Sequence, residues 1–243
     1  MYARKRVLFV KPPDRFLENE FVYLQLAPHY LQSFLTENDV ESDILVLYER
    51  GNSNRDSFLS IDNQIGLSNL SSFLVKQNGV VSDTTFDPMI FQDYDIVGMS
   101  VMTPQAPDAY SLNRLLKKEF PNIVTVIGGS HARYYQDQVN NLPGDISFDF
   151  IVPQDGWNAI LKIALGRVTR QTRPIVLSES LPKLINLPAP TRPPLLMEKY
   201  AFEIAGVRAF HTITALGCPF TCHFCESGIE RVRTFSPEMI TRD

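Results

Sequence analysis

The segment Asp95-Ile-Val-Gly-Met-Ser-Val101 is the stretch of sequence that determines the fold class. Its apolar residues are almost uninterrupted, which is typical of a parallel strand that is buried on both faces of a sheet. Similar apolar runs occur at Val7–Val10, Ile44–Leu47, Ile123–Ile127 and Phe148–Val152. Five such strands, separated by longer segments, predict a parallel sheet covered by helices.

Apolar residues recur at helical spacing in four of the intervening or following segments. These stripes span Leu31–Leu35, Leu67–Leu74, Leu112–Leu116 and Trp157–Leu165. We therefore predict an α/β fold over residues 1–175, with a doubly wound parallel sheet of the flavodoxin or Rossmann type. The expected strand order is 2-1-3-4-5, numbering the strands as they occur in the sequence.

The composition changes after this region. Five of the 17 prolines fall between Pro182 and Pro194, and such a segment forms neither a long helix nor a central strand. We expect a proline-rich linker over residues 176–204 and the beginning of a second domain over 205–243. In that second domain, Ala209–Ala215 is predicted to form a strand, and a helix is expected to begin near Pro237.

All three cysteines lie within eight residues, as Cys218-Pro-Phe-Thr-Cys222-His-Phe-Cys225. Three thiolates on one short loop can bind three irons of a 4Fe–4S cluster and leave the fourth iron without a protein ligand. That open iron can bind a small molecule and pass it an electron. The spacing therefore indicates an iron–sulfur site.

Other uses of these cysteines stay open. A structural zinc ion normally needs four ligands, and His223, the nearby candidate, is adjacent to Cys222 and poorly placed to share one ion with it. A redox dithiol of Cys222 and Cys225 would normally lie beside a thioredoxin-like unit. A disulfide would leave one cysteine unpaired, and nothing in the sequence suggests secretion.

The charge and hydropathy of the chain exclude several classes of partner. A net charge of −4 gives no support for a nucleic-acid surface. No apolar run approaches the roughly 20 residues that a membrane span needs. The basic N-terminus leads into an apolar run that is too short for a signal peptide. We expect no nucleic-acid partner, no membrane span and a cytoplasmic location.

Several segments together resemble the cobalamin-binding radical S-adenosylmethionine (SAM) enzymes. They are Val7–Pro13, Asp95–Pro104, Pro121–His131, Trp157–Leu165, Leu187–Tyr200 and Thr212–Ser227. In that family a Rossmann-like domain that holds cobalamin is followed by a partial (β/α) barrel. The resemblance implies that residues 205–243 begin such a barrel. We therefore expect the chain to be a fragment of a longer enzyme or a truncated homologue, incomplete as a catalyst.

The resemblance also implies the residues of the site. Cys218, Cys222 and Cys225 would ligate the 4Fe–4S cluster, and Phe224 matches an aromatic position that contacts the adenine of SAM. Cobalamin would lie at the carboxyl ends of the strands, near the switch in strand order. The contacts expected there are Pro12, Ser100, Thr103, Gly128 and Gly129. The glycines would let the backbone approach a flat macrocycle or its nucleotide tail.

The chain departs from the family pattern in two loops. It lacks the Asp-x-His-x-x-Gly motif that supplies a histidine to cobalt in one cobalamin class, and His131 is not expected to replace it. Where the family often has a Gly-Glu-Gly-Glu-like turn, this chain has Pro153-Gln-Asp-Gly-Trp157. This difference puts the contacts of that loop with a nucleotide tail in doubt.

The function implied by the resemblance is that of a radical SAM enzyme, a methyltransferase acting on an unactivated carbon or phosphorus. The cluster would cleave SAM to a 5′-deoxyadenosyl radical, and cobalamin would donate the methyl group. Alternatives are a cyclase or rearrangement enzyme, a cobalamin-binding module without chemistry, and a zinc or redox-switch protein. The expected partners are a small-molecule or peptide substrate and an electron donor such as flavodoxin or ferredoxin.

Overall fold

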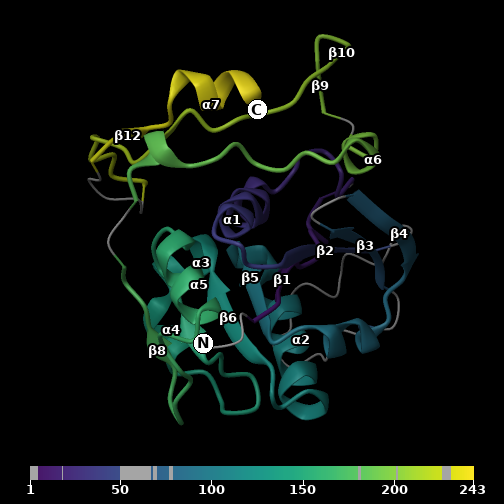
Figure 1. The fold of residues 1–243 in the computed structure, drawn as a ribbon, viewed down its shortest axis with the longest axis vertical. Helices are drawn as coiled ribbons and strands as arrows, with labels where there is room; N and C mark the ends of the chain where they lie inside the picture. Colours follow the sequence, from purple (N-terminus) through teal and green to yellow (C-terminus); the bar gives the residue numbers. More distant parts are fainter. Residues whose placement is uncertain are drawn as a thin grey trace.

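The central sheet has the predicted order of parallel strands. The computed structural model describes residues 5–17, 19–49, 67, 70–76, 79–179, 182–200, 202–225 and 231–243. The five predicted strands are β1 (Val7–Lys11), β2 (Ser42–Glu49), β5 (Ile96–Ser100), β6 (Val124–Gly128) and β7 (Phe150–Ile151). They are parallel and lie in the order β2-β1-β5-β6-β7, which confirms the order 2-1-3-4-5 (Figure 1).

Three further strands extend this sheet to eight among the described residues. β8 (Ile175–Val176) pairs in parallel with β7, although residue 176 was predicted to begin the linker. β3 (Leu70–Lys76) and β4 (Gly79–Thr85) form an antiparallel hairpin beside β2. The helix predicted over Leu67–Leu74 is therefore wrong for the part that falls in β3. The periodicity of a short apolar run is ambiguous, and pairing with the buried strand β2 decides for a strand.

Helices cover both faces of the sheet. The longer ones are α1 (Leu26–Glu37), α2 (Ala106–Glu119) and α5 (Trp157–Ala164), and the shorter ones are α3 (Gly129–Tyr134) and α4 (Gln136–Asn140). In β1, Val7 and Phe9 pack into the core that contains α1 and α5, whereas Leu8 and Val10 pack into the core that contains α2. This alternation explains why the parallel strands are apolar along their whole length. The 3-10 turns with described bounds are η3 (Pro88–Asp93), η4 (Thr103–Gln105) and, later, η5 (Leu184–Asn186).

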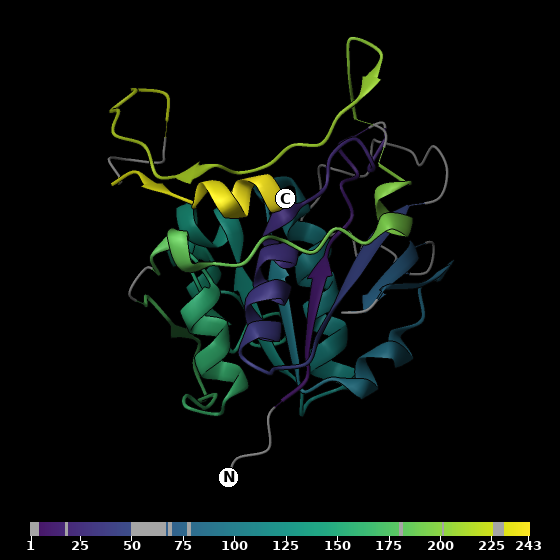
Figure 2. The ribbon, with the colours of Figure 1, turned by 45° about the horizontal axis from the view of Figure 1, so that its top comes forward.

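The C-terminal part of the chain lies across the carboxyl edge of the sheet. It contains α6 (Pro194–Met197), the hairpin of β9 (Glu203–Ile204) and β10 (Val207–Arg208), the pair β11 (Ala215–Leu216) and β12 (Arg233–Thr234), and α7 (Pro237–Arg242). Figure 2 shows the chain passing over α1 between η5 and α6, with α7 above it. The helix expected near Pro237 is confirmed. The strand predicted over Ala209–Ala215 is wrong except at Ala215, which begins β11. The residues before it contact the domain instead: His211 Nε2 lies 2.7 Å from the Leu24 carbonyl, and the Tyr30 hydroxyl donates to the Ile213 carbonyl at 3.5 Å.

A buried polar cluster fixes the proline-rich segment to α1. The Thr191 hydroxyl donates to Gln32 Oε1 at 2.7 Å, and His29 Nδ1 lies 3.0 Å from the same hydroxyl. Arg192 next to it pairs with the carboxylate of Asp243 and donates to the carbonyl of His211 at 2.8 Å. The segment is therefore packed along α1 by specific contacts, and it carries the C-terminal part to the ends of the strands.

In the portion of the chain that the structure describes, no helix combines the length and the apolar character needed to cross a membrane.

Burial of His29 makes the stability of the fold dependent on pH. Burial, assisted by the nearby charge of Arg192, lowers its pKa from 6.5 to about 3. Between these values the unfolded chain binds more protons than the folded chain, so stability falls as the pH decreases. We expect a loss of about 2 kcal/mol in the free energy of unfolding between pH 7 and pH 5. Urea unfolding at the two pH values measures it.

The matched variants are His29→Gln and His223→Gln, which remove a buried and an exposed imidazole. With His29→Gln, the loss in the free energy of unfolding between pH 7 and pH 5 should be smaller by about 2 kcal/mol than in the wild type. With His223→Gln, this loss should be unchanged. Equal slopes for the wild type and His29→Gln would contradict the assignment.

Candidate functional site

A cavity of about 320 Å³ lies at the carboxyl ends of β5, β6 and β7, on the face covered by α1 and α5. Ligands of open parallel sheets bind at this edge. The strand ends contribute Ser100, Gly128 and Val152 to its lining, and the C-terminal part contributes Ile213, Leu216 and Phe235. The C-terminal part thus forms one wall of the cavity.

The floor and sides of the cavity are mainly apolar and aromatic. Gly98 lies opposite Phe9 in the sheet, and a Cβ at Gly98 would stand 3.3 Å from the Phe9 ring. Tyr30 stacks on Phe235 with ring centroids 5.2 Å apart, and meets Trp157 edge-on at 6.5 Å. The buried Trp157 Nε1 has no hydrogen-bond partner in the described structure. A buried donor without a partner is costly, so this wall suits a ligand that can accept its hydrogen bond.

A tight turn at Gly129 forms the rim of the cavity. Gly129 has φ +86°, in the left-handed region that favours glycine. A Cβ there would stand 2.6 Å from the nitrogen and 2.7 Å from the oxygen of Val101, so a larger residue does not fit. At Gly128 the corresponding contact, with the Val152 oxygen, is an ordinary 3.4 Å. Of the two glycines, Gly129 is the one that the backbone requires.

The predicted cobalamin contacts lie in two groups. Ser100, Gly128 and Gly129 line the cavity. Pro12 is buried away from it, and its carbonyl accepts from Gln105 Nε2 at 3.3 Å. Thr103 is exposed at the start of η4, and its hydroxyl lies 3.3 Å from His131 Nδ1. The structure thus brings together three of the five expected residues.

His131 is held by protein groups on both sides of its ring. Nε2 lies 2.6 Å from the Tyr110 hydroxyl, Nδ1 faces Thr103, and the ring stacks on Tyr135 with centroids 5.3 Å apart. Burial lowers the pKa of this histidine, which favours the neutral imidazole. The expectation that His131 does not bind cobalt stays a prediction, and these contacts agree with it.

The loop that departs from the family pattern also lines the cavity. Asp155 forms an ion pair with Arg233 at 2.6 Å, which joins this loop to β12 of the C-terminal part. Sequence reasoning missed this pair, because nothing in the spacing of residues 155 and 233 indicates a contact. It also missed Tyr30 and Trp157 as cavity residues: Tyr30 precedes the predicted stripe Leu31–Leu35, and the stripe that begins at Trp157 indicates only that its residues are buried.

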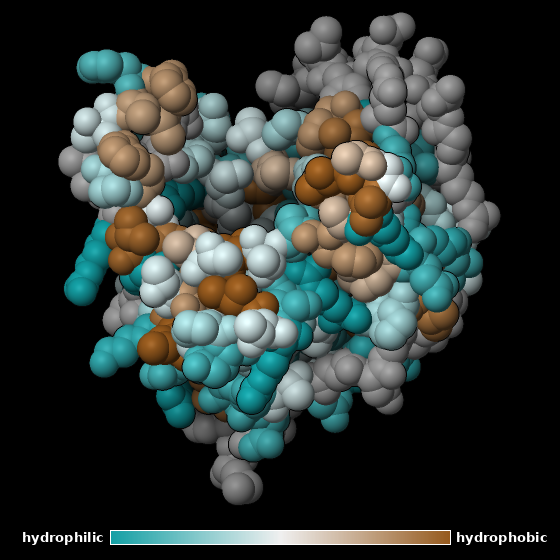
Figure 3. All heavy atoms as spheres, turned by 90° about the horizontal axis from the view of Figure 1, so that it is seen from above, coloured by the Kyte–Doolittle hydropathy of each residue, from teal (hydrophilic) through white to brown (hydrophobic). Residues whose placement is uncertain are grey.

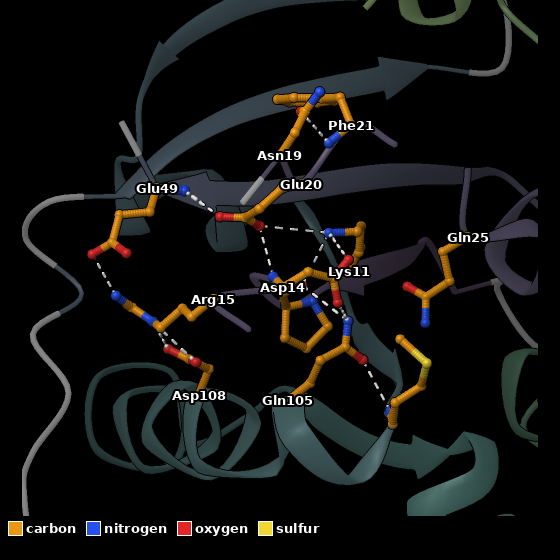
Figure 4. A network of polar contacts seen from close by, with 12 residues as sticks. Lys11, Asp14, Arg15, Asn19, Glu20, Phe21, Gln25, Glu49, Gln105 and Asp108 are labelled. Carbon is orange, nitrogen blue, oxygen red and sulfur yellow. Dashed lines mark hydrogen bonds and ion pairs between the residues drawn. The ribbon is translucent and has the colours of Figure 1, made fainter. Parts of the chain in front are cut away.

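A buried charged network fills the neighbouring space at the end of β1 (Figure 4). Lys11 Nζ lies 2.7 Å from Asp14 and 3.7 Å from Glu20. Arg15 pairs with Asp108 at 3.0 Å and with Glu49 at 2.5 Å. Burial raises the pKa of Glu20, and it raises the pKa of Asp108 to about 6. This network ties the loop after β1 to β2 and α2.

The cysteine loop projects from the C-terminal part. Cys218 is half-buried, Cys222 and Cys225 are exposed, and none of the three is in a disulfide. Cys225 N–H donates to the Cys222 carbonyl at 3.0 Å, which closes a tight turn between them. Gly217, before the first cysteine, has φ +91°, and a Cβ there would overlap the carbonyl of Arg231. Phe224 is 92% exposed.

The donor set fits an iron–sulfur cluster in its chemistry, since three cysteines outside disulfides on one loop are the ligands that such a cluster takes. Within the described ranges, no three His, Cys, Asp or Glu side chains are arranged around a common point suitable for a single metal ion.

Seen from above, apolar side chains lie on either side of a hollow in the surface (Figure 3). Exposed apolar residues of the C-terminal part include Ile204, Val207, Phe220 and Phe224.

Comparison with known proteins agrees with this geometry. Residues 77–160 match the family model described as the B12 binding domain, a range that contains β5, β6 and β7 and the turns that line the cavity. Over this range the chain is similar to B12 binding domains, in agreement with the cobalamin-binding family that the sequence motifs resemble.

Particular relatives extend the similarity beyond this domain. The chain is 28% identical over 189 residues to an uncharacterized methyltransferase of Pyrococcus horikoshii, a match that covers 68% of the chain and 41% of that protein. It is 30% identical over 149 residues to an anaerobic magnesium-protoporphyrin IX monomethyl ester cyclase of Rubrivivax gelatinosus, covering 54% of the chain and 26% of the cyclase. The same-named cyclase of Cereibacter sphaeroides is 26% identical, over 54% of the chain and 24% of its own length. The chain spans less than half the length of these relatives.

The turn at Gly129 predicts a large effect of one methyl group. We expect Gly129→Ala to lower the free energy of unfolding by at least about 3 kcal/mol, because it adds both a strained φ and a clash with Val101. Gly144→Ala is the control, since its Cβ would meet nothing within 4 Å. Urea unfolding checks both variants. Similar small losses in the two would show that the turn can relax.

Proposed function

We propose that the protein is a cobalamin-dependent radical SAM enzyme, a methyltransferase that acts on an unactivated carbon or phosphorus. The observation that carries the proposal is the location of the cavity: it opens among the strand ends of a B12-binding domain and is walled by the segment that bears the three cysteines. The match to a protein named as a methyltransferase supports the reaction class.

The cavity is suited to one part of cobalamin. At about 320 Å³ it lies at the lower end of the range for small-molecule pockets. A flat heteroaromatic base fits this volume, whereas a corrin macrocycle does not. We assign the nucleotide tail to the cavity, with Trp157 Nε1 as an available donor and the aromatic walls as contacts. Ser100, Gly128 and Gly129 would contact the part of cobalamin that lies at the rim of the cavity.

This assignment is tested by comparing hydroxocobalamin with cobinamide, which lacks the nucleotide tail. The wild type should bind hydroxocobalamin at least about tenfold more tightly, because the tail gains apolar burial. Ala27 is exposed and lines the cavity, so Ala27→Phe should narrow it without unfolding the chain. That variant should lose the preference, and Ala27→Ser should keep it. If the wild type bound hydroxocobalamin and cobinamide equally tightly, the assignment of the nucleotide tail to the cavity would be wrong.

The cysteine loop would hold the second cofactor. When bound, a 4Fe–4S cluster with one open iron supplies an electron for reductive cleavage of SAM. The three cysteines would ligate the cluster, and the turn between Cys222 and Cys225 keeps the backbone of these two residues close. The exposed ring of Phe224 could then contact the adenine of SAM, which gives this apolar side chain a partner. An electron donor such as flavodoxin or ferredoxin would reach the cluster from the exposed side of the loop.

Each cysteine should therefore be required for the cluster. After anaerobic reconstitution we expect about four irons per chain and broad visible absorption. Replacing Cys218, Cys222 or Cys225 singly with Ala should abolish or strongly reduce iron retention. His223→Ala, in the same loop, should retain iron like the wild type. Stoichiometric zinc with no iron uptake would instead support a zinc site.

A cyclase is the second candidate function, and the observation that favours it is the match to the two cyclases. The fate of the substrate, a small molecule or a peptide, would distinguish a methyltransferase from a cyclase. Methyl transfer would place an isotopically labelled methyl group from SAM in the product, and cyclisation would not.

A further inference from the structure

Two loops diverge at the switch point of the sheet. β1 and β5 are hydrogen-bonded neighbours, but the chain leaves β1 toward β2 on one side and leaves β5 toward β6 on the other. Their carboxyl-terminal loops therefore separate, and the crevice between them has no backbone hydrogen bonds of the sheet to set its width. Side chains must do so.

The buried amide of Gln105 joins these loops (Figure 4). Its Nε2 donates to Asp14 Oδ1 at 2.5 Å and to the Pro12 carbonyl at 3.3 Å, both in the loop after β1. Its Oε1 accepts from the Met102 N–H at 2.9 Å, in the loop after β5. One side chain thus uses both ends of its amide, one for each loop.

The loop after β5 is the same segment that forms the rim of the cavity. The Ser100 carbonyl accepts from Gln25 Nε2 at 2.9 Å. The Val101 N–H donates to the Gly128 carbonyl, and the Val101 carbonyl accepts from the His131 N–H, each at 2.9 Å. With Met102 held by Gln105, the backbone from Ser100 to Met102 is fixed from both sides, and Ser100 lines the cavity.

We infer that Gln105 is a positioning residue for the cofactor: it fixes the separation of the loops after β1 and β5 and thereby the rim on which cobalamin rests. The inference rests on the proposed binding of cobalamin. Gln105 is fully buried and does not line the cavity, so it acts through Met102, Ser100 and the Pro12–Asp14 loop rather than by touching the ligand.

Gln105→Glu separates the two functions of the amide. A carboxylate still accepts from the Met102 N–H, but it can donate neither to Asp14 nor to the Pro12 carbonyl. It also adds a second negative charge beside the ion pair of Lys11 with Asp14. At pH 8 we expect the Kd for hydroxocobalamin to rise on the order of tenfold relative to the wild type. At pH 5.5, where a carboxyl group beside Asp14 is expected to be protonated, it can donate again. The difference from the wild type should then largely disappear.

Asn113→Asp is the matched control. Asn113 is an equally buried amide in α2, the helix that follows Gln105. Its Nδ2 donates to the carbonyls of Ile146 and Ser147 at 2.8 and 3.0 Å, which lie before β7 and not in the loop after β5. Both variants should lower the melting temperature. Only Gln105→Glu should weaken binding, because only its contacts join the loops at the cofactor site.

A second variant keeps the test decisive if Gln105→Glu alone does not fold. The exchange Gln105→Glu with Asp14→Asn reverses the polarity of the bond and conserves the charge of the pair, so we expect a Kd within about threefold of the wild type. If Asn113→Asp lowered both the melting temperature and the affinity for hydroxocobalamin as Gln105→Glu does, the inference would be overturned. Unchanged affinity of Gln105→Glu at both pH values would also overturn it. No binding by the wild type would instead overturn the proposed function and the inference with it.

Discussion

The close contact between the exit of β5 and the turn after β6 is the constraint on which the site depends. The Val101 N–H and carbonyl are both hydrogen-bonded to this turn, and the contact leaves no space for a Cβ at Gly129. Because the backbone itself fills that space, this contact fixes Ser100 and the two glycines relative to one another without any side chain. The side chain of Gln105 then fixes this backbone relative to the loop after β1.

The two halves of the carboxyl edge are organised differently. Over β1, charged and polar side chains pack against one another in ion pairs. Over β5, β6 and β7, aromatic and small residues leave a space that the C-terminal part closes. Glycine at 98 opposite Phe9, rather than a larger residue, contributes to that space. The polar half fixes the loops, and the apolar half is shaped to receive a ligand.

The C-terminal part is fixed to the domain by contacts that cross large distances in sequence. Thr191 binds Gln32 of α1, and Arg192 beside it donates to the carbonyl of His211. Phe235 stacks on Tyr30, and Arg233 pairs with Asp155. These contacts bring the segment that carries the cysteines to the same edge as the cavity. A shared edge for the two proposed cofactors is what an enzyme combining their chemistry requires.

The parallel strands, the turn at Gly128-Gly129 and the loop of three cysteines could be predicted from the sequence, because buried strands, glycine turns and cysteine spacing are local patterns. The strand order followed from the fold class that these strands indicate. Ser100, Gly128 and Gly129 could be predicted at the site since each lies near the carboxyl end of a predicted strand. Tertiary structure alone decided that Leu70–Lys76 is a strand, that Pro12 and Thr103 lie outside the cavity, and that Tyr30, Trp157 and Phe235 form its walls. Those outcomes depend on which segments meet across the fold, and periodicity records only that a residue is buried.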